Sequence, residues 1–197
     1  MNKINLNKLR DKSYKTAYDH GFHDKDLSNE HYLCLVISEL MEAVEADRKS
    51  KKSNRLKFEK EFSKYPALVE ESKRFKCAFE KFIKDTVEDE LADAVIRLFD
   101  LAGARNISFG IAVKDIVDDC IDDMAESCKD ETFTESIYAI STLPVRYSGL
   151  YDFPTVINDM VLSIFGLAKH IGINLFWHID QKMKYNELRE KRHGKKY

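Results

Sequence analysis

The sequence predicts an all-α protein, a helical bundle that forms one domain from the whole chain, residues 1–197. The chain contains only seven glycines and three prolines, whereas a fold of many short strands needs frequent turn residues. Apolar residues also recur at three- and four-residue steps over long segments, which is the periodicity of helices. A chain of this length can bury one core and does not require a second domain.

Composition and charge exclude several classes of protein. Hydrophobic residues make up 44% and charged residues 34% of the chain, as in ordinary folded proteins. The net charge of −2 gives no overall attraction to nucleic acid or to an anionic membrane. No apolar run is long enough to span a bilayer, the N-terminus has no signal-like core, and the four cysteines lack zinc or disulfide-redox spacing. We therefore expect a cytoplasmic protein with reduced thiols.

The first 30 residues predict one short helix followed by a turn-like segment, GFHDKDLSNEH. Phe22 and His23 stand in this segment. Two interpretations remain open for them: they pack against the start of the next helix, or they form a wall of a ligand pocket.

The segment from His31 to Lys49 predicts the first acidic helix. Its apolar residues cover most of a helical circumference, so we expect the helix to be mostly buried. Glu39 and Glu42, three residues apart, project from the same side. A buried carboxylate must be paired, protonated or bound to a metal, so this pair requires a partner elsewhere in the chain.

Residues 50–85 predict two amphipathic helices that are interrupted near Pro66. Their many lysines and glutamates are expected to be solvated, and Lys84 and Asp85 are the only two considered for a supporting role. The second acidic helix follows at residues 86–104, where Thr86 and Asp89 form a predicted capping box. The helix is apolar except for one polar line. This line consists of Glu90, Asp93, Arg97 and Asp100. Two buried helices with a carboxylate pair each suggest one shared site.

A third acidic run differs from these two pairs. The apolar residues of IVDDCIDDMAESC form one continuous stripe, so the acids between residues 118 and 126 are expected on the solvated face. Glu39, Glu42, Glu90 and Asp93 have no such solvated face in the pattern.

A weak internal similarity relates residues 93–109 to residues 159–175. If it reflects a duplicated helical pair, the second copy has Thr142 and Val145 where the first has Glu39 and Glu42, and it has lost the acidic site. Two unrelated amphipathic helices would explain the same similarity.

The C-terminal segment, residues 182–197, carries seven lysines and arginines and two glutamates. Such a run is typical of a disordered tail. Its interspersed Tyr185 and Asn186 support a second interpretation, in which the segment supplies donors that wrap a triphosphate.

Four stretches resemble a known family: GFHD, LVISELMEAVEADRK, EDELADAVIRLFDLAG and KMKYNELREKRHGKKY. The chain is similar in them to the MazG-like all-α nucleoside triphosphate pyrophosphohydrolases, relatives of the dimeric dUTPases and dCTPases. The resemblance implies an enzyme that hydrolyses a nucleoside triphosphate to the monophosphate and pyrophosphate, a hydrolase acting on an acid anhydride.

The resemblance also implies roles for individual residues. Glu39, Glu42, Glu90 and Asp93 take the positions that hold Mg²⁺, with Mn²⁺ as a possible substitute. The substrate-binding positions are Lys182, Tyr185, Asn186, Arg189 and Lys195, and we add Arg97 and His23 as further candidates. Phe22, His23, Tyr32 and Trp177 are candidates for contact with a base.

The chain departs from the family pattern in three places. A basic residue often found three positions before the ExxD pair is Val87 here. The spacer between Glu42 and Glu90 is longer than in compact relatives, and residues 108–174 resemble an insertion or degenerate repeat. A homodimer is implied by the resemblance, but an internal repeat would allow a monomer.

The residues themselves agree with metal chemistry, since carboxylate oxygens without nearby histidine or cysteine suit Mg²⁺ or Mn²⁺. Glu42 is our choice for the group that positions the attacking water or accepts its proton. A di-iron carboxylate bundle needs Glu-x-x-His pairs, and that spacing occurs only at Glu190 and His193. The non-enzymatic alternative is a helical interaction protein in which the acids form buried salt bridges with Arg97 and Arg48.

Overall fold

The computed structural model describes residues 5–64, 68–110 and 114–191, and within these ranges the protein is all-helical, with no strand. The helices are α1 (Leu6–Asp19), α2 (Asn29–Arg48), α3 (Arg55–Lys64), α4 (Glu71–Phe82), α5 (Val87–Ala104), α6 (Lys114–Ser127), α7 (Phe133–Arg146), α8 (Phe153–His170) and α9 (Leu175–Glu187). The predicted fold class is therefore confirmed.

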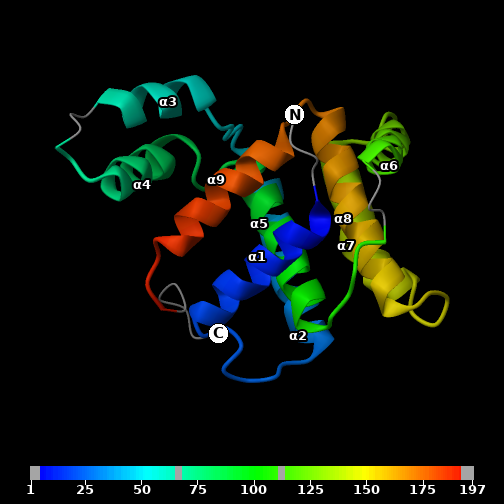
Figure 1. The fold of residues 1–197 in the computed structure, drawn as a ribbon. Coiled ribbons are helices and arrows are strands. Elements are labelled where there is room, and N and C mark those ends of the chain that lie inside the picture. Colours follow the sequence, from blue (N-terminus) through cyan, green and yellow to red (C-terminus); the bar gives the residue numbers. More distant parts are fainter. Residues whose placement is uncertain (1–4, 65–67, 111–113, 192–197) are drawn as a thin grey trace.

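Helix α5 is the central element. It packs against α1, α2, α8 and α9, and Figure 1 shows it inside the bundle with α1 crossing in front. The cause lies in its sequence, because apolar or small side chains occur on all of its sides. The prediction that this segment has almost no solvated face is confirmed.

Helix α2 is less buried than its sequence suggests. It packs against α5 and α7, but Cys34, Ser38, Met41, Glu42 and Glu45 form an exposed face. Single apolar side chains such as Met41 are normal on a protein surface. The expectation that α2 is buried around most of its circumference was therefore wrong, and Glu42 is an exposed acid.

The second half of the chain forms the other side of the bundle. Helix α8 packs against α5, α6 and α7, and α7 also reaches α2. On α6, Asp119, Asp122, Asp123 and Glu126 are exposed and Asp118 is half-buried, which confirms the predicted solvated face. Helices α5 and α8 lie side by side, but a duplication of the two helical pairs stays a prediction.

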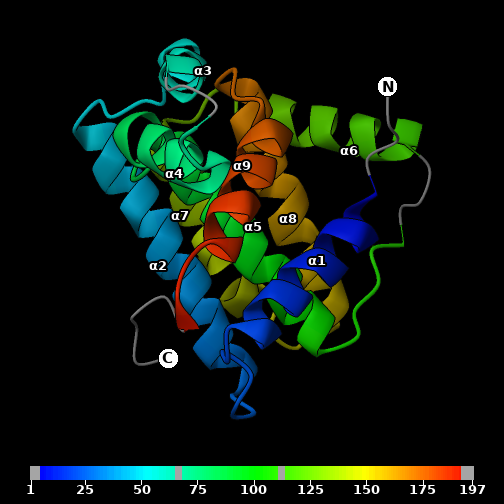
Figure 2. The same ribbon diagram turned by 60° about the vertical axis from the view of Figure 1, so that its left-hand side comes forward.

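Helices α3 and α4 form a hairpin outside the bundle, next to α9 (Figures 1 and 2). Both predicted helices are present, and Pro66 lies outside the described residues. Their inward aromatic side chains form a second cluster with two residues of α9. This aromatic cluster consists of Phe58, Phe62, Phe75, Phe79, Phe82, Trp177 and Tyr185, with Ala78 and Ile83.

Among the described residues, no single helix is long and apolar enough to cross a membrane; only α8 and α9 together pass that test, and they are bent by 115°.

Candidate functional site

Three carboxylates from two helices converge between α2 and α5. Glu39, Glu42 and Glu90 each offer an oxygen that lies within 4.8 Å of the others. Glu39 is 3% exposed and Glu90 is 4% exposed, while Glu42 closes the group on the solvent side. Three of the four predicted metal ligands therefore form one group, which we call the acidic triad.

The N-terminus of α5 fixes the acids of its first turn. The Thr86 hydroxyl accepts a hydrogen bond from the Asp89 N–H at 3.3 Å, which confirms Thr86 as the N-cap. The Asp89 carboxylate accepts from the Asp85 N–H at 3.0 Å, one residue before the cap, so the predicted capping box is only half formed. Lys84 Nζ lies 2.6 Å from Asp85 Oδ1 at the surface, and Asp85 also offers an oxygen within 4.8 Å of oxygens of Asp89 and Glu90.

Asp93, the fourth predicted ligand, is bound by a buried lysine of α9. Lys182 Nζ lies 2.9 Å from Asp93 Oδ2 and 2.8 Å from Asp89 Oδ2, and Lys182 is 4% exposed. Burial opposes the charged ammonium, but the Asp93 and Asp89 carboxylates offset it and raise the pKa of Lys182 above its ordinary value. Lys182 belongs to α9, so the predicted basic tail begins inside a buried helix.

Arg97 neutralises one member of the acidic triad. Its Nε and Nη2 both lie 2.6 Å from Glu39 Oε1. Burial and the neighbouring Asp93 raise the pKa of Glu39, and Arg97 opposes that rise. The ion pair with Arg97 that the non-enzymatic alternative expects is therefore present, and the contact of Arg97 with substrate stays a prediction. Arg48 pairs instead with Glu45 at the surface.

Glu90 has no direct ion pair in the described part of the chain, although the charge of Lys182 partly offsets the rise in its pKa. Burial, followed by repulsion from Asp89, raises the pKa of Glu90 to about 9. Burial also raises the pKa of Asp89 to about 6, against the attraction of Lys182. The Asp89 Oδ1 atom is buried without a hydrogen-bond partner in the part of the chain that the structure describes. Within the same residues, we find no hydrogen bond to the Glu90 carboxyl group.

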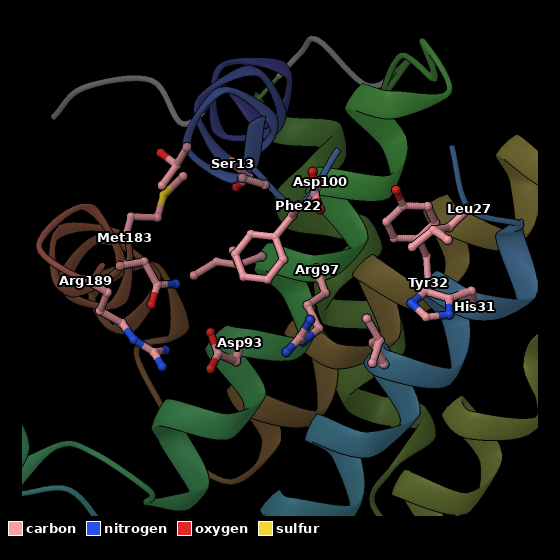
Figure 3. Close-up of a pocket in the computed structure, with 15 residues that line it drawn as sticks. Ser13, Phe22, Leu27, His31, Tyr32, Asp93, Arg97, Asp100, Met183 and Arg189 are labelled. Carbon is pink, nitrogen blue, oxygen red and sulfur yellow. The ribbon is translucent and has the colours of Figure 1, made fainter. Parts of the chain in front are cut away.

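A pocket opens beside these acids. Asp93, Arg97 and Asp100 of α5 line it between Met183 of α9 on one side and His31 and Tyr32 of α2 on the other (Figure 3), and Arg189, just after α9, also lines it. Phe22 extends into the pocket from the turn after α1, where Gly21 adopts a φ of +77° that favours glycine. The pocket thus combines the charged groups of α5 with polar side chains from α1, α2 and the end of α9, and with the apolar surface of Phe22 and Met183.

His23 lies behind the pocket and does not line it. His23 Nε2 is 2.6 Å from Asp100 Oδ1, and the Tyr32 hydroxyl is 3.1 Å from His23 Nδ1. Burial raises the pKa of Asp100, and the contact with His23 opposes that rise. The interpretation as a pocket wall therefore holds for Phe22. His23 instead packs at the start of α2, where its hydrogen bonds orient Asp100 and Tyr32.

The remaining predicted substrate contacts separate into three groups. Asn186 and Arg189 line the pocket. Tyr185 stacks on Phe79 with ring centroids 4.4 Å apart and donates its hydroxyl to Glu80 at 2.9 Å, so it belongs to the aromatic cluster. Trp177 packs in the same cluster and does not line the pocket, and its contact with a base stays a prediction. Lys195 and His193 lie outside the described residues.

Sequence reasoning missed two members of the site. Asp89 was interpreted only as a cap residue, yet it is 1% exposed and holds Lys182. The pairing of Asp100 with His23 was also missed. A signal for Asp100 was present, since it continues the polar line of Glu90, Asp93 and Arg97.

In comparisons with protein-family models, with curated proteins and with solved structures, the chain finds no match.

Proposed function

We propose that the protein hydrolyses a nucleoside or deoxynucleoside triphosphate to the monophosphate and pyrophosphate, with Mg²⁺ held by the acidic triad. One observation carries the proposal: three carboxylates from two helices converge, two of them buried, with oxygens within 4.8 Å of one another. Proteins leave such a group in place only when protons or cations compensate it.

The charge balance around the triad supports a bound cation. Five carboxyl groups meet here, Glu39, Glu42, Glu90, Asp89 and Asp93, whereas the ion pairs of the described residues supply two cations to them, Arg97 and Lys182. Three carboxyl groups (5 − 2) therefore need protons or a bound cation, and in the absence of metal one of these protons is on Glu90, whose pKa is raised to about 9. All possible ligands are hard carboxylate oxygens, which suit Mg²⁺ or Mn²⁺ better than zinc.

The chain's own residues divide the remaining work. When bound, Mg²⁺ neutralises negative charge on the phosphate oxygens and lowers the pKa of a water molecule bound to it. Glu42, the exposed member of the triad, is our choice to position that water or accept its proton. Lys182 and Arg97 lie beside Asp93 and Glu39 and stabilise negative charge on the phosphates. The pocket holds the nucleoside next to Phe22.

Pyrophosphate release across a panel of nucleotides with Mg²⁺ tests the proposal. Glu39→Gln keeps the shape of the side chain but removes a charged ligand, so we expect about a 100-fold loss of turnover. Asp123→Asn is the matched control, because it removes an exposed acid of α6 and should keep full turnover. Turnover by Glu39→Gln equal to that of the wild type would exclude the triad as the site.

A helical interaction protein without catalysis is the second candidate. The pairs of Glu39 with Arg97 and of Lys182 with Asp89 and Asp93 favour it, since buried ion pairs can serve structure alone. The two functions differ in their response to metal. Mg²⁺ with a non-hydrolysable nucleotide should raise the melting temperature of the enzyme, whereas a structural salt-bridge core gains nothing from either addition.

A further inference from the structure

Lys182 has two acidic partners whose surroundings differ. Asp89 is 1% exposed, and its Oδ2 atom accepts from both Lys182 Nζ and the Asp85 N–H, so the backbone holds it in place. Asp93 retains 19% of its side-chain exposure and lines the pocket. The contact with Asp89 is therefore a fixed anchor, while the contact with Asp93 lies where a ligand can compete for it.

Arg97 does not face the same competition. Its hydrogen bond and ion pair with Glu39 both go to Oε1, so the second oxygen of that carboxylate, Oε2, has no hydrogen bond with Arg97. A cation can therefore bind Glu39, Glu42 and Glu90 beside Arg97. Asp93, in contrast, is already paired with the Lys182 ammonium, whose Nζ lies 2.9 Å from the Asp93 oxygen. A cation that binds Asp93 must compete with this ammonium and is repelled by its positive charge.

We infer that Lys182 is an exchangeable counter-ion of Asp93, which stays anchored on Asp89 and turns toward phosphate when a divalent cation takes Asp93. The inference rests on the proposed function and adds a regulatory property to the same site. Lys182 weakens the binding of the cation alone, because it competes for Asp93 and repels the incoming charge. A phosphate group removes this penalty by giving the ammonium a new anionic partner.

Coupling between the two ligands follows from this exchange. If phosphate strengthens the binding of the cation by some factor, the cation strengthens the binding of phosphate by the same factor. The site then binds metal and phosphate together and binds either one poorly alone. Lys182 is in this sense a positioning residue, and its effect is visible in binding without any turnover.

Calorimetric titration of the full chain with Mg²⁺ tests the inference, first alone and then with methylenediphosphonate, with free Mg²⁺ corrected for its complex with the phosphonate. Methylenediphosphonate should strengthen Mg²⁺ binding to the wild type by about tenfold. In Lys182→Met, Mg²⁺ alone should bind about tenfold more tightly than to the wild type, and the phosphonate should add about twofold at most. Lys184→Met is the matched control, because Lys184 is on the same helix and pairs with Asp180 at the surface, and it should behave as the wild type does.

Lys182→Met leaves Asp89 buried without its counter-ion, so a second variant protects the test from loss of folding. In Asp89→Asn/Lys182→Met both partners are neutral, and it should show the same gain in Mg²⁺ affinity with native helicity by circular dichroism. Equal Mg²⁺ affinity in the wild type and in both variants overturns the inference but leaves the proposed function standing. Absence of Mg²⁺ binding in every variant, with and without the phosphonate, overturns both.

Discussion

Replacement of Glu90 by glutamine should stabilise the protein in the absence of metal. In the folded chain the pKa of Glu90 is raised to about 9, so at pH 7 the side chain is protonated, whereas in the unfolded chain it ionises with its ordinary value of 4.5. Folding at pH 7 must therefore bind a proton. Glutamine is a neutral side chain of the same shape and avoids this requirement.

The magnitude follows from the distance between pH 7 and the unfolded pKa. That distance is 7 − 4.5 = 2.5 pH units, and each unit costs about 1.36 kcal/mol, so Glu90→Gln gains up to about 3 kcal/mol. For a chain of this size each kcal/mol corresponds to about 2–4 °C in Tm. Thermal unfolding in EDTA should therefore show a Tm that exceeds that of the wild type by up to about 6–12 °C.

The sign of the pH dependence provides a second check. Because the folded pKa is raised, the wild type is more stable in acid and loses stability as pH rises from about 4.5 toward 9. The gain of Glu90→Gln over the wild type should grow with pH across that window and shrink when Mg²⁺ is added, since Mg²⁺ stabilises only the chain that binds it. Glu42→Gln, at the exposed member of the triad, should change stability by less than about 0.5 kcal/mol in EDTA. A Glu90→Gln chain less stable than the wild type in EDTA at pH 7 would refute the reasoning.

Two further predictions concern other parts of the fold. Burial lowers the pKa of His178 to about 4, so its full contribution to the free energy of unfolding is present above pH 6.5 and falls by up to about 3 kcal/mol as pH drops toward 4. Urea unfolding at pH 6.5 and at pH 4 should show a smaller loss of stability in His178→Gln than in the wild type. Equal losses in the two proteins would contradict this role of His178. Gly166→Ala places a Cβ 2.7 Å from the Met124 carbonyl carbon of α6 and should cost about 1–3 kcal/mol, whereas Gly110→Ala, with open space around it, should cost almost nothing. An unchanged Gly166→Ala protein would show that α6 and α8 pack less closely than described.

Most of the fold was predictable from periodicity and caps. The stripe on α6 and the apolar surface of α5 report burial directly, because each helix follows one clear pattern. Helix α2 was predicted poorly because Cys34 and Met41 are compatible with either core or surface, so residue type alone does not say on which side the neighbours lie.

The candidate site was predictable as a set of acids but not as a set of pairs. The spacing of Glu39, Glu42 and Glu90 places them on two helices, and their convergence follows once those helices pack together. The pairing of Lys182 with Asp89 and Asp93 depends on how α9 crosses α5, which no local pattern specifies, whereas a pairing of the acids with Arg97 was already one of the alternatives. A lysine in a basic run looks solvated in sequence, yet Lys182 is buried because α9 brings it onto two aspartates.

The position of α9 between two separate apolar clusters has a consequence for local unfolding. Met183 belongs to the main core, while Tyr185 belongs to the aromatic cluster under the α3–α4 hairpin. Because the hairpin buries its apolar side chains in its own cluster, it can open as a unit while the main core stays closed. Native-state hydrogen exchange should therefore protect the amides of α5 more strongly than those of α3 and α4. Helix α9 would then mark the boundary between two cooperative units.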